Sequence, residues 1–341
     1  MAANPLHSHI KIDKQELTHI FTGFNDKKVL VIGDVMLDAY WWGKVERISP
    51  EAPVPIVNIN RRENRLGGAA NVAINLQHLG AKPILAAVLG QDREGDTFLD
   101  ICKQEGIGID GIIRSDDRPT TVKTRVVGNK SQLLRIDSEE NKPLSNGDRN
   151  ALHDEIKNLL NDTDLVIFED YDKGVIDEGL IHWVIKEANE RRIPVAVDPK
   201  KRNFLAYKNA TLFKPNLREL AEGLKTDLNG SSSITDIQND VKELIEKLNI
   251  KYALITLSER GVYIAGKGQD FLIPAHIRTI YDVSGAGDTV ISVAALAMLN
   301  QCAPDIIAAL ANLAGGLVCE KIGAVPIDKE ELFNEAVKEF C

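Results

Sequence analysis

The chain has 341 residues, of which 44% are hydrophobic and 27% charged, as in an ordinary globular protein. Its formal net charge of −9 argues against a nucleic-acid partner, whereas a phosphorylated small molecule would need only a local basic pocket and a divalent cation. No apolar run is long enough to span a bilayer, and residues 1–26 lack the apolar core of a secretory signal, which predicts a cytoplasmic protein without a membrane partner. The four cysteines form no Cys-x-x-Cys pair, so neither a zinc site nor a disulfide framework is indicated.

Short apolar strands alternate with amphipathic helices along most of the chain. The sequence predicts strands over residues 28–34, 83–88, 165–169, 194–198 and 254–257. It predicts helices over residues 71–79, 94–105, 149–160, 176–190 and 234–248. This alternation indicates one α/β domain, residues 1–341, built on a doubly wound, mainly parallel sheet. Ligands of such sheets bind beyond the carboxyl ends of the strands, where Asp34, Glu169, Asp170 and Asp198 stand.

Two segments, about 38–60 and 119–137, break this alternation. They are rich in β-branched residues that alternate with polar ones, which predicts antiparallel strands with Gly128-Asn129-Lys130 as a hairpin turn. A small separate sheet would form a lid over the active site of the α/β body. It is too small to bury both faces, and exposed Trp41 and Trp42 predict that it docks on a second subunit to form a homodimer. The alternative is that the tryptophans pack against the body of their own chain.

Two glycine-rich turns lead into helices. In the first, Gly67 and Gly68 let a ligand lie against the backbone, and Asn71 offers a donor and an acceptor to sugar hydroxyls. In the second, Gly285-Ala286-Gly287-Asp288 begins an apolar helix whose first N–H groups have no intrahelical partner, so that the helix start suits an anion such as a phosphoryl group. Asp288 would then accept a proton from an attacking hydroxyl. Its alternative role is a simple helix cap.

Taken together, Gly-Gly-x-x-Asn-x-Ala early and Asp-x-x-Gly-Ala-Gly-Asp late resemble the two signatures of the ribokinase-like (PfkB) carbohydrate kinases. The chain contains no Gly-x-x-x-x-Gly-Lys-Ser/Thr loop, no Gly-x-Gly-x-x-Gly after the first strand, and neither His-Glu-x-x-His nor Gly-x-Ser-x-Gly. P-loop, dinucleotide-binding, metalloprotease and α/β-hydrolase chemistry therefore have no support. The resemblance implies an ATP- and Mg²⁺-dependent sugar kinase.

A narrower resemblance is carried by residues 31–57, beginning Val-Ile-Gly-Asp-Val-Met-Leu-Asp, and by four shorter blocks. The blocks are residues 133–137, 170–174, 197–200 and 215–219. They are similar to the kinase domain of the bifunctional ADP-heptose synthases. That likeness implies phosphorylation of D-glycero-β-D-manno-heptose 7-phosphate on its anomeric oxygen, in the synthesis of ADP-heptose and lipopolysaccharide core precursors. No His-x-Gly-His motif of a nucleotidyltransferase domain is present, which predicts a stand-alone kinase or a truncated chain.

The alternatives are a kinase of the same family for another phosphosugar, of the fructose 1-phosphate or tagatose 6-phosphate type, and a non-catalytic sugar-phosphate sensor. The intact turn at residues 285–288 argues against the sensor, because a sensor needs no catalytic base.

Roles for individual residues follow from the resemblance. Asp288 would be the base, ionised because of its place at a helix N-terminus, and the N–H groups of residues 285–287 would hold the γ-phosphoryl group. The sugar would be bound by Asp34, Asp38, Gly67, Gly68 and Asn71. Asn216 and Glu219 match an Asn-x-x-Glu motif that organises Mg²⁺ and its waters beside ATP, although the same spacing fits a helix capping box.

The remaining candidates bind the two phosphate-bearing ligands. Lys173 and Arg135 are the favoured cations for the substrate phosphate. The other basic candidates are Arg47, Lys123, Lys200 and Lys201. On the nucleotide side, we expect Ser258 and Gly261 in a turn between strands, and Asn312 at the start of a helical segment that completes the adenine pocket.

Overall fold

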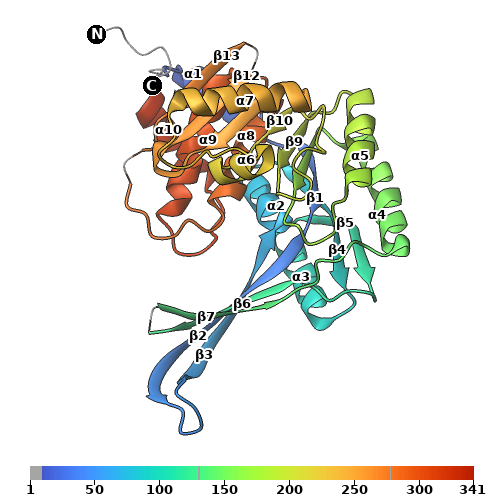
Figure 1. The fold of residues 1–341 in the computed structure, drawn as a ribbon, viewed down its shortest axis with the longest axis vertical. Helices are drawn as coiled ribbons and strands as arrows, with labels where there is room; N and C mark the ends of the chain where they lie inside the picture. Colours follow the sequence, from blue (N-terminus) through green and yellow to red (C-terminus); the bar gives the residue numbers. More distant parts are fainter. Residues whose placement is uncertain (1–9, 130, 267, 277) are drawn as a thin grey trace.

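The computed structural model describes residues 10–129, 131–266, 268–276 and 278–341 (Figure 1). In this part of the chain, a nine-stranded sheet runs in the order β13-β12-β11-β10-β9-β8-β1-β4-β5. Its strands are β1 (Lys28–Gly33), β4 (Lys82–Gly90), β5 (Gly108–Ser115), β8 (Leu165–Glu169), β9 (Val195–Asp198), β10 (Leu212–Phe213), β11 (Tyr252–Thr256), β12 (Val262–Gly266) and β13 (Gln269–Ile273). Neighbours from β5 to β11 are parallel, and β12 and β13 extend the sheet antiparallel.

Helices cover both faces of this sheet, as the alternation of strands and helices predicts. One face carries α1 (Lys14–Thr22), α2 (Ala69–His78), α3 (Arg93–Gln104), α8 (Ala286–Leu299), α9 (Pro304–Cys319) and α10 (Lys329–Phe340). The other carries α4 (Asn146–Leu159), α5 (Glu178–Glu190), α6 (Leu217–Leu224) and α7 (Ile234–Leu248). Strand β1 shows why its sequence is apolar throughout: Val29 and Val31 enter one core, and Leu30 and Ile32 enter the other.

The lid is a second, four-stranded sheet that projects from the body (Figure 1). It consists of β2 (Val35–Ile48), β3 (Pro55–Gly68), β6 (Val122–Gly128) and β7 (Ser131–Ser138), in the order β3-β2-β6-β7. The outer pairs are antiparallel as predicted, but the central pair β2–β6 is parallel. The chain passes through α2, β4, α3 and β5 between these two strands, which gives the long connection that a parallel pair needs. Lys130, in the predicted hairpin turn, lies outside the described residues.

The prediction that Trp41 and Trp42 are exposed is wrong, because arginines of the neighbouring strand cover them. Arg62 lies over the ring of Trp41 at 5.0 Å, and Arg61 lies over that of Trp42 at 4.8 Å. Both tryptophans are half-buried. Arginine side chains can cover apolar surface in this way while their charge stays in water.

Among the described residues, no helix is both long and apolar enough to cross a membrane.

Candidate active site

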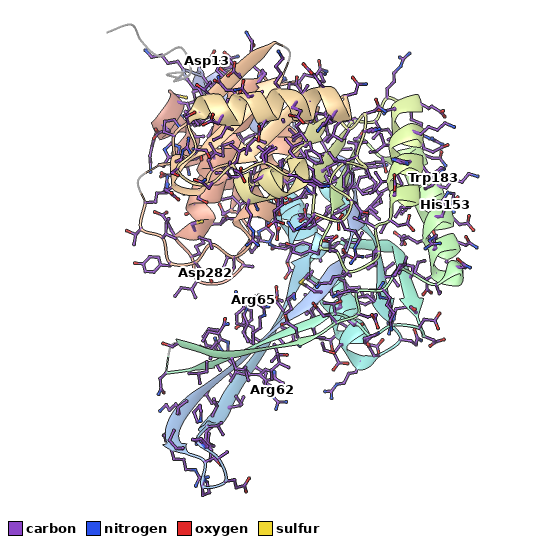
Figure 2. All side chains as sticks on the ribbon, viewed as in Figure 1. Asp13, Arg62, Arg65, His153, Trp183 and Asp282 are labelled. Atoms are coloured by element: carbon purple, nitrogen blue, oxygen red, sulfur yellow. The ribbon has the colours of Figure 1, made fainter. Side chains whose placement is uncertain are left out.

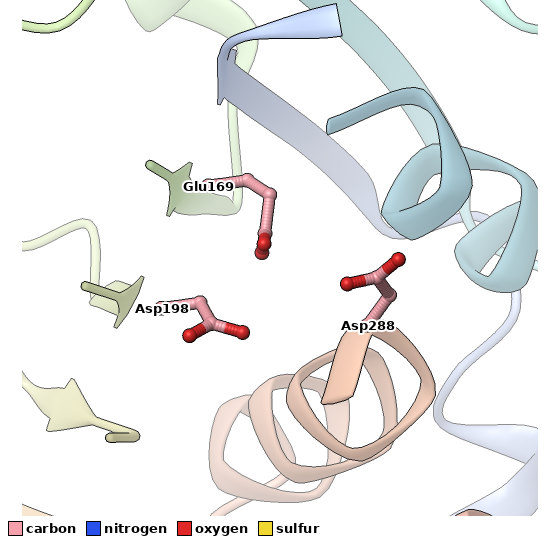
Figure 3. A group of neighbouring side chains, drawn as sticks. All are labelled: Glu169, Asp198 and Asp288. Carbon is pink, nitrogen blue, oxygen red and sulfur yellow. The ribbon is translucent and has the colours of Figure 1, made fainter. Parts of the chain in front are cut away.

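Three buried carboxylates meet at the carboxyl end of the large sheet (Figure 3). Glu169 ends β8 and Asp198 ends β9, and the two are register partners on adjacent parallel strands. Asp288 reaches them from the first turn of α8. Oxygen atoms of the three side chains lie within 4.8 Å of one another. The predicted ligand-binding edge of the sheet is therefore a concentrated acidic site.

This acidic site fits a divalent cation. Neither oxygen of Glu169 has a hydrogen-bond partner in the described part of the chain. Oδ1 of Asp198 also has none there. Burial, together with the charges of Asp198 and Asp288, raises the pKa of Glu169 well above its usual value. Unpartnered buried carboxylates are costly unless a cation is bound, and oxygen ligands suit Mg²⁺. Sequence reasoning placed Glu169 and Asp198 at strand ends but did not identify them as metal ligands.

Asp288 is held from both sides by neutral donors. Nδ2 of Asn71 donates to its Oδ2 at 2.5 Å, and the hydroxyl of Tyr171 donates to its Oδ1 at 3.0 Å. Burial raises the pKa of Asp288 to about 6, against the effect of the two hydrogen bonds. Burial therefore outweighs the effect of the helix N-terminus on this pKa. A carboxylate with a pKa near 6 is still mainly ionised at neutral pH and is well matched to general-base work.

The turn before α8 has the shape expected of an anion-binding site. Gly285 has a φ of 79°, in the left-handed region that favours glycine. A Cβ at this position would also lie only 2.8 Å from Nδ2 of Asn71, which is too close. The N–H of Ala286 is turned to the carbonyl of Val283 at 3.3 Å. No acceptor among the described residues binds the N–H groups of Gly285, Gly287 and Asp288, so these three donors are open to a ligand. The Asp288 side chain caps nothing, so the simple cap alternative is not observed.

Asp34 follows β1 and shapes the turn that carries Tyr171. Its carboxylate accepts the N–H groups of Tyr171, Lys173 and Val175 at 3.0, 3.1 and 3.1 Å. Burial raises its pKa. Gly68 packs on the same residue, since a Cβ there would lie 2.3 Å from the Asp34 carbonyl oxygen. The contacts are those of a turn-forming residue, and the assignment of Asp34 and Gly68 to sugar binding stays a prediction.

Asp38 lies on the lid, where it pairs with Arg125 of β6. It also packs on Gly67, because a Cβ on that glycine would lie 2.5 Å from Oδ2 of Asp38. Arg65 of the lid approaches the region of the body that contacts the loop carrying Asp282 (both residues are labelled in Figure 2). Contacts with the body support this: Arg65 lies 3.5 Å from the carbonyl oxygen of Ala324, and Asp282 accepts the N–H of Gly323 at 2.9 Å.

The nucleotide-side candidates are partly brought together. Asn216 and Glu219 form the complete capping box of α6, with hydrogen bonds of 2.8 and 2.9 Å. The other oxygen of Glu219 accepts from Nζ of Lys200 at 2.6 Å, so water-mediated metal binding there stays a prediction. Asn216 and Ser258 line one cavity of about 680 Å³.

Of the other two nucleotide-side candidates, Gly261 lies beside Ser258 and donates its N–H to that residue's carbonyl at 3.0 Å, whereas Asn312 lies on α9. Gly261 ends a short 3₁₀ turn, η2 (Ser258–Arg260), and Asn312 of α9 donates to the carbonyl of Pro274 at 2.8 Å.

Most of the predicted phosphate-binding cations are engaged by carboxylates. Lys173 donates to Glu139 at 2.7 Å, and Arg135 makes two hydrogen bonds of 2.9 Å with Asp137. Lys123 contacts both of these carboxylates, and Lys201 lies 3.6 Å from Glu222. The assignment of Lys173 and Arg135 to the substrate phosphate stays a prediction.

Comparison with known proteins agrees with this geometry. Residues 26–330 match the family model of the pfkB family carbohydrate kinases. The chain therefore belongs to the PfkB family and is a carbohydrate kinase.

Sequence relatives and solved structures add detail. The chain is 39% identical over 306 residues to Bifunctional protein HldE of Helicobacter pylori (strain J99), covering 90% of this chain and 65% of the relative. It thus spans less than two thirds of that relative's length. Phosphofructokinase-2 from Escherichia coli in complex with fructose-6-phosphate shares the fold, with a TM-score of 0.76 at 15% identity over 93% of this chain and 99% of that one. Arabidopsis thaliana ribokinase complexed with ribose and ATP aligns with a TM-score of 0.69 at 18% identity over 90% and 99%.

Proposed function

We propose that this kinase transfers the γ-phosphoryl group of ATP to the anomeric hydroxyl of D-glycero-β-D-manno-heptose 7-phosphate and forms the 1,7-bisphosphate. The observation that carries the proposal is the buried Asp288, with a pKa of about 6, beside the open N–H groups of the turn into α8. The choice of sugar is supported by the likeness of residues 31–57 to the ADP-heptose synthases and by the identity to HldE proteins.

In the proposed mechanism, Asp288 takes the proton of the attacking hydroxyl while Asn71 and Tyr171 hold its carboxylate in place. The N–H groups of Gly285, Gly287 and Asp288 bind the oxygens of the phosphoryl group during transfer and offset the charge that develops on them. Glu169 and Asp198 would hold Mg²⁺, which neutralises the charge of the ATP phosphates when it is bound.

The direct test measures ADP release with ATP, Mg²⁺ and the heptose 7-phosphate, alongside a panel of other sugar phosphates. We expect rapid turnover on the heptose and its loss in Asp288→Asn. Turnover on another sugar alone would keep the mechanism and reject the heptose. Binding of the heptose phosphate without turnover on any sugar would instead support a sensor.

We further propose that the lid forms the interface of a homodimer. Strand β7 is an edge of the lid sheet, and Leu133, Leu134 and Ile136 on it are 42%, 55% and 47% exposed. Exposed edge strands with large apolar side chains tend to pair with another chain. Light scattering after size-exclusion chromatography should give a dimer mass for the wild type and a monomer mass for Leu134→Asp. A monomeric wild type would reject the interface.

A further inference from the structure

Lys214 is a buried lysine beside the acidic site that the mechanism above does not use. It directly follows β10 and is 3% exposed. Its Nζ lies 2.7 Å from Oδ2 of Asp198. A Cβ built on Gly287 would lie 3.7 Å from the same Nζ. The ammonium group therefore stands between the end of β9 and the turn that leads into α8.

The hydrogen-bonding capacity of this ammonium group is mostly unused. A lysine has three N–H donors, and among the described residues Asp198 is the one acceptor in contact with Nζ of Lys214. A buried ammonium group with donors to spare is costly unless it meets an anion.

The space beside Gly287 is where that anion would lie. A Cβ on Gly287 would be at ordinary contact distance from both Nζ of Lys214 and Oδ2 of Asp198, so the glycine leaves a small gap between the turn and the two side chains. The open N–H groups of Gly287 and Asp288 border the gap from the helix side. A phosphoryl group in this gap would meet backbone donors on one side and an ammonium group on the other.

We propose that Lys214 is a catalytic residue that binds the phosphoryl group during its transfer; this rests on the proposed kinase function. The acceptor hydroxyl loses its proton to Asp288, and its oxygen forms a bond to the γ-phosphorus. The bond between that phosphorus and the β,γ-bridging oxygen breaks, and ADP leaves with the electron pair. Lys214 donates to an oxygen of the moving group, whose charge it offsets.

The competing explanation is that Lys214 only neutralises Asp198. A structural role of this kind would affect folding, or binding of the metal, but would not act on the transition state. The two explanations differ in which kinetic constant changes, because a group that acts mainly in the transition state lowers kcat with little effect on KM.

The first experiment measures steady-state kinetics of Lys214→Met with ATP, saturating Mg²⁺ and the heptose 7-phosphate. We expect kcat to fall at least about a hundredfold, with both KM values within about threefold of wild type. Lys247→Met, which removes an exposed lysine of α7 paired with Glu243, is the matched control and should keep wild-type kinetics. A folded Lys214→Met with nearly wild-type kcat would overturn the proposal.

A second pair of variants decides the case if Lys214→Met does not fold. The two variants are Asp198→Asn and Asp198→Asn/Lys214→Met. The double variant removes both charges of the ion pair, so it leaves neither of them buried without its partner. Thermal unfolding checks that both variants are folded. A catalytic lysine predicts that the double variant is at least about tenfold slower than Asp198→Asn at saturating Mg²⁺. Equal kcat values would assign Lys214 to neutralising Asp198 only.

These measurements distinguish rejection of the proposed kinase function from rejection of the role of Lys214. If the wild type turns over no sugar phosphate, the proposed function is rejected. If the wild type turns over the heptose phosphate and the variants lacking Lys214 turn it over equally well, the role of Lys214 alone is rejected.

Discussion

The lid and the carboxyl end of the large sheet differ in how completely their charged side chains are paired. On the lid, opposite charges are matched: Arg125 pairs with Asp38, and Arg65 lies 2.6 Å from Glu63. At the sheet end, three carboxylates crowd together in the interior. Asp198 pairs with Lys214 there, but neither oxygen of Glu169 has a hydrogen-bond partner among the described residues.

The difference separates charges that serve the fold from charges that serve a ligand. Paired groups that are partly exposed, such as Arg65 and Glu63, add little to stability and cost little. Buried carboxylates that repel one another make folding harder and are retained where a cation or a proton transfer needs them. If this difference between the two regions holds, substitutions at the sheet end should lower kcat far more than substitutions on the lid.

Asp288→Asn should lower kcat by roughly a thousandfold, because general-base catalysis is worth about 10²–10⁴. In the wild type, kcat/KM should rise with pH and level off above the pKa of about 6 of Asp288, since only the ionised form accepts a proton. The measurement is a pH–rate profile from pH 5 to 8. An acid limb that persists unchanged in Asp288→Asn would assign the titration to another group.

Glu169→Gln should weaken Mg²⁺ binding and at the same time stabilise the fold at alkaline pH. The pKa of Glu169 is raised in the folded state, so its contribution to stability is full below its unfolded pKa of about 4.3 and is lost as the pH rises through the folded pKa. The glutamine variant escapes this loss. At pH 8 without metal we expect a gain of about 1–2 kcal/mol in the free energy of unfolding.

Denaturant unfolding with EDTA and with Mg²⁺ checks this. Added Mg²⁺ should stabilise the wild type more than the variant, because it binds only the folded site. Equal stabilisation of both would place the metal away from Glu169.

Tyr171→Phe should raise the apparent pKa of the acid limb by roughly 0.5–1 and lower kcat severalfold. The phenol donates a hydrogen bond that favours the ionised form of Asp288, so its removal favours the protonated form. Tyr263→Phe, which removes a hydroxyl bonded to Asp270 on the antiparallel side of the sheet, is the control. A lower kcat without any shift of the pH profile would contradict the role of the hydroxyl in tuning the base.

Arg135→Met should change the free energy of unfolding by no more than about 0.5 kcal/mol, because its ion pair with Asp137 is half exposed. If Arg135 also binds the substrate phosphate, as predicted from the sequence, KM for the sugar phosphate should rise roughly tenfold while kcat changes little. An unchanged KM would remove Arg135 from the binding site.

Sequence patterns located the body of the fold because its signals are local. The apolar run of β1 and the helical periodicity of α7, predicted over the same residues 234–248 that the structure gives, depend only on near neighbours. Strand β5 was not predicted, since Gly108, Asp110 and Gly111 interrupt its apolar pattern. The parallel pairing of β2 with β6 was also missed, because the paired residues Leu37 and Val122 are far apart in the chain.

In the candidate active site, too, residues with a local sequence signal were predicted and residues whose position depends on distant parts of the chain were not. Asp288 and Asn71 were found because each belongs to a short motif, and the structure brings them into contact. Tyr171 and Lys214 were missed because nothing in their immediate sequence indicates a partner; their positions depend on which strand ends are neighbours in the sheet. The capping box at Asn216 and Glu219 was readable from spacing alone, and it formed as its alternative interpretation described.

The lid strands are continuous in sequence with residues of the candidate active site. Strand β2 begins at Val35, directly after Asp34, and β3 runs to Gly68, one residue before α2, which carries Asn71. No flexible connection separates the lid from either residue. Strands β2 and β3 and the site residues therefore share one stretch of backbone on each side. We expect a substitution that shifts the register of β2 against β3 to disturb the turn that holds Tyr171 and the start of α2 as well.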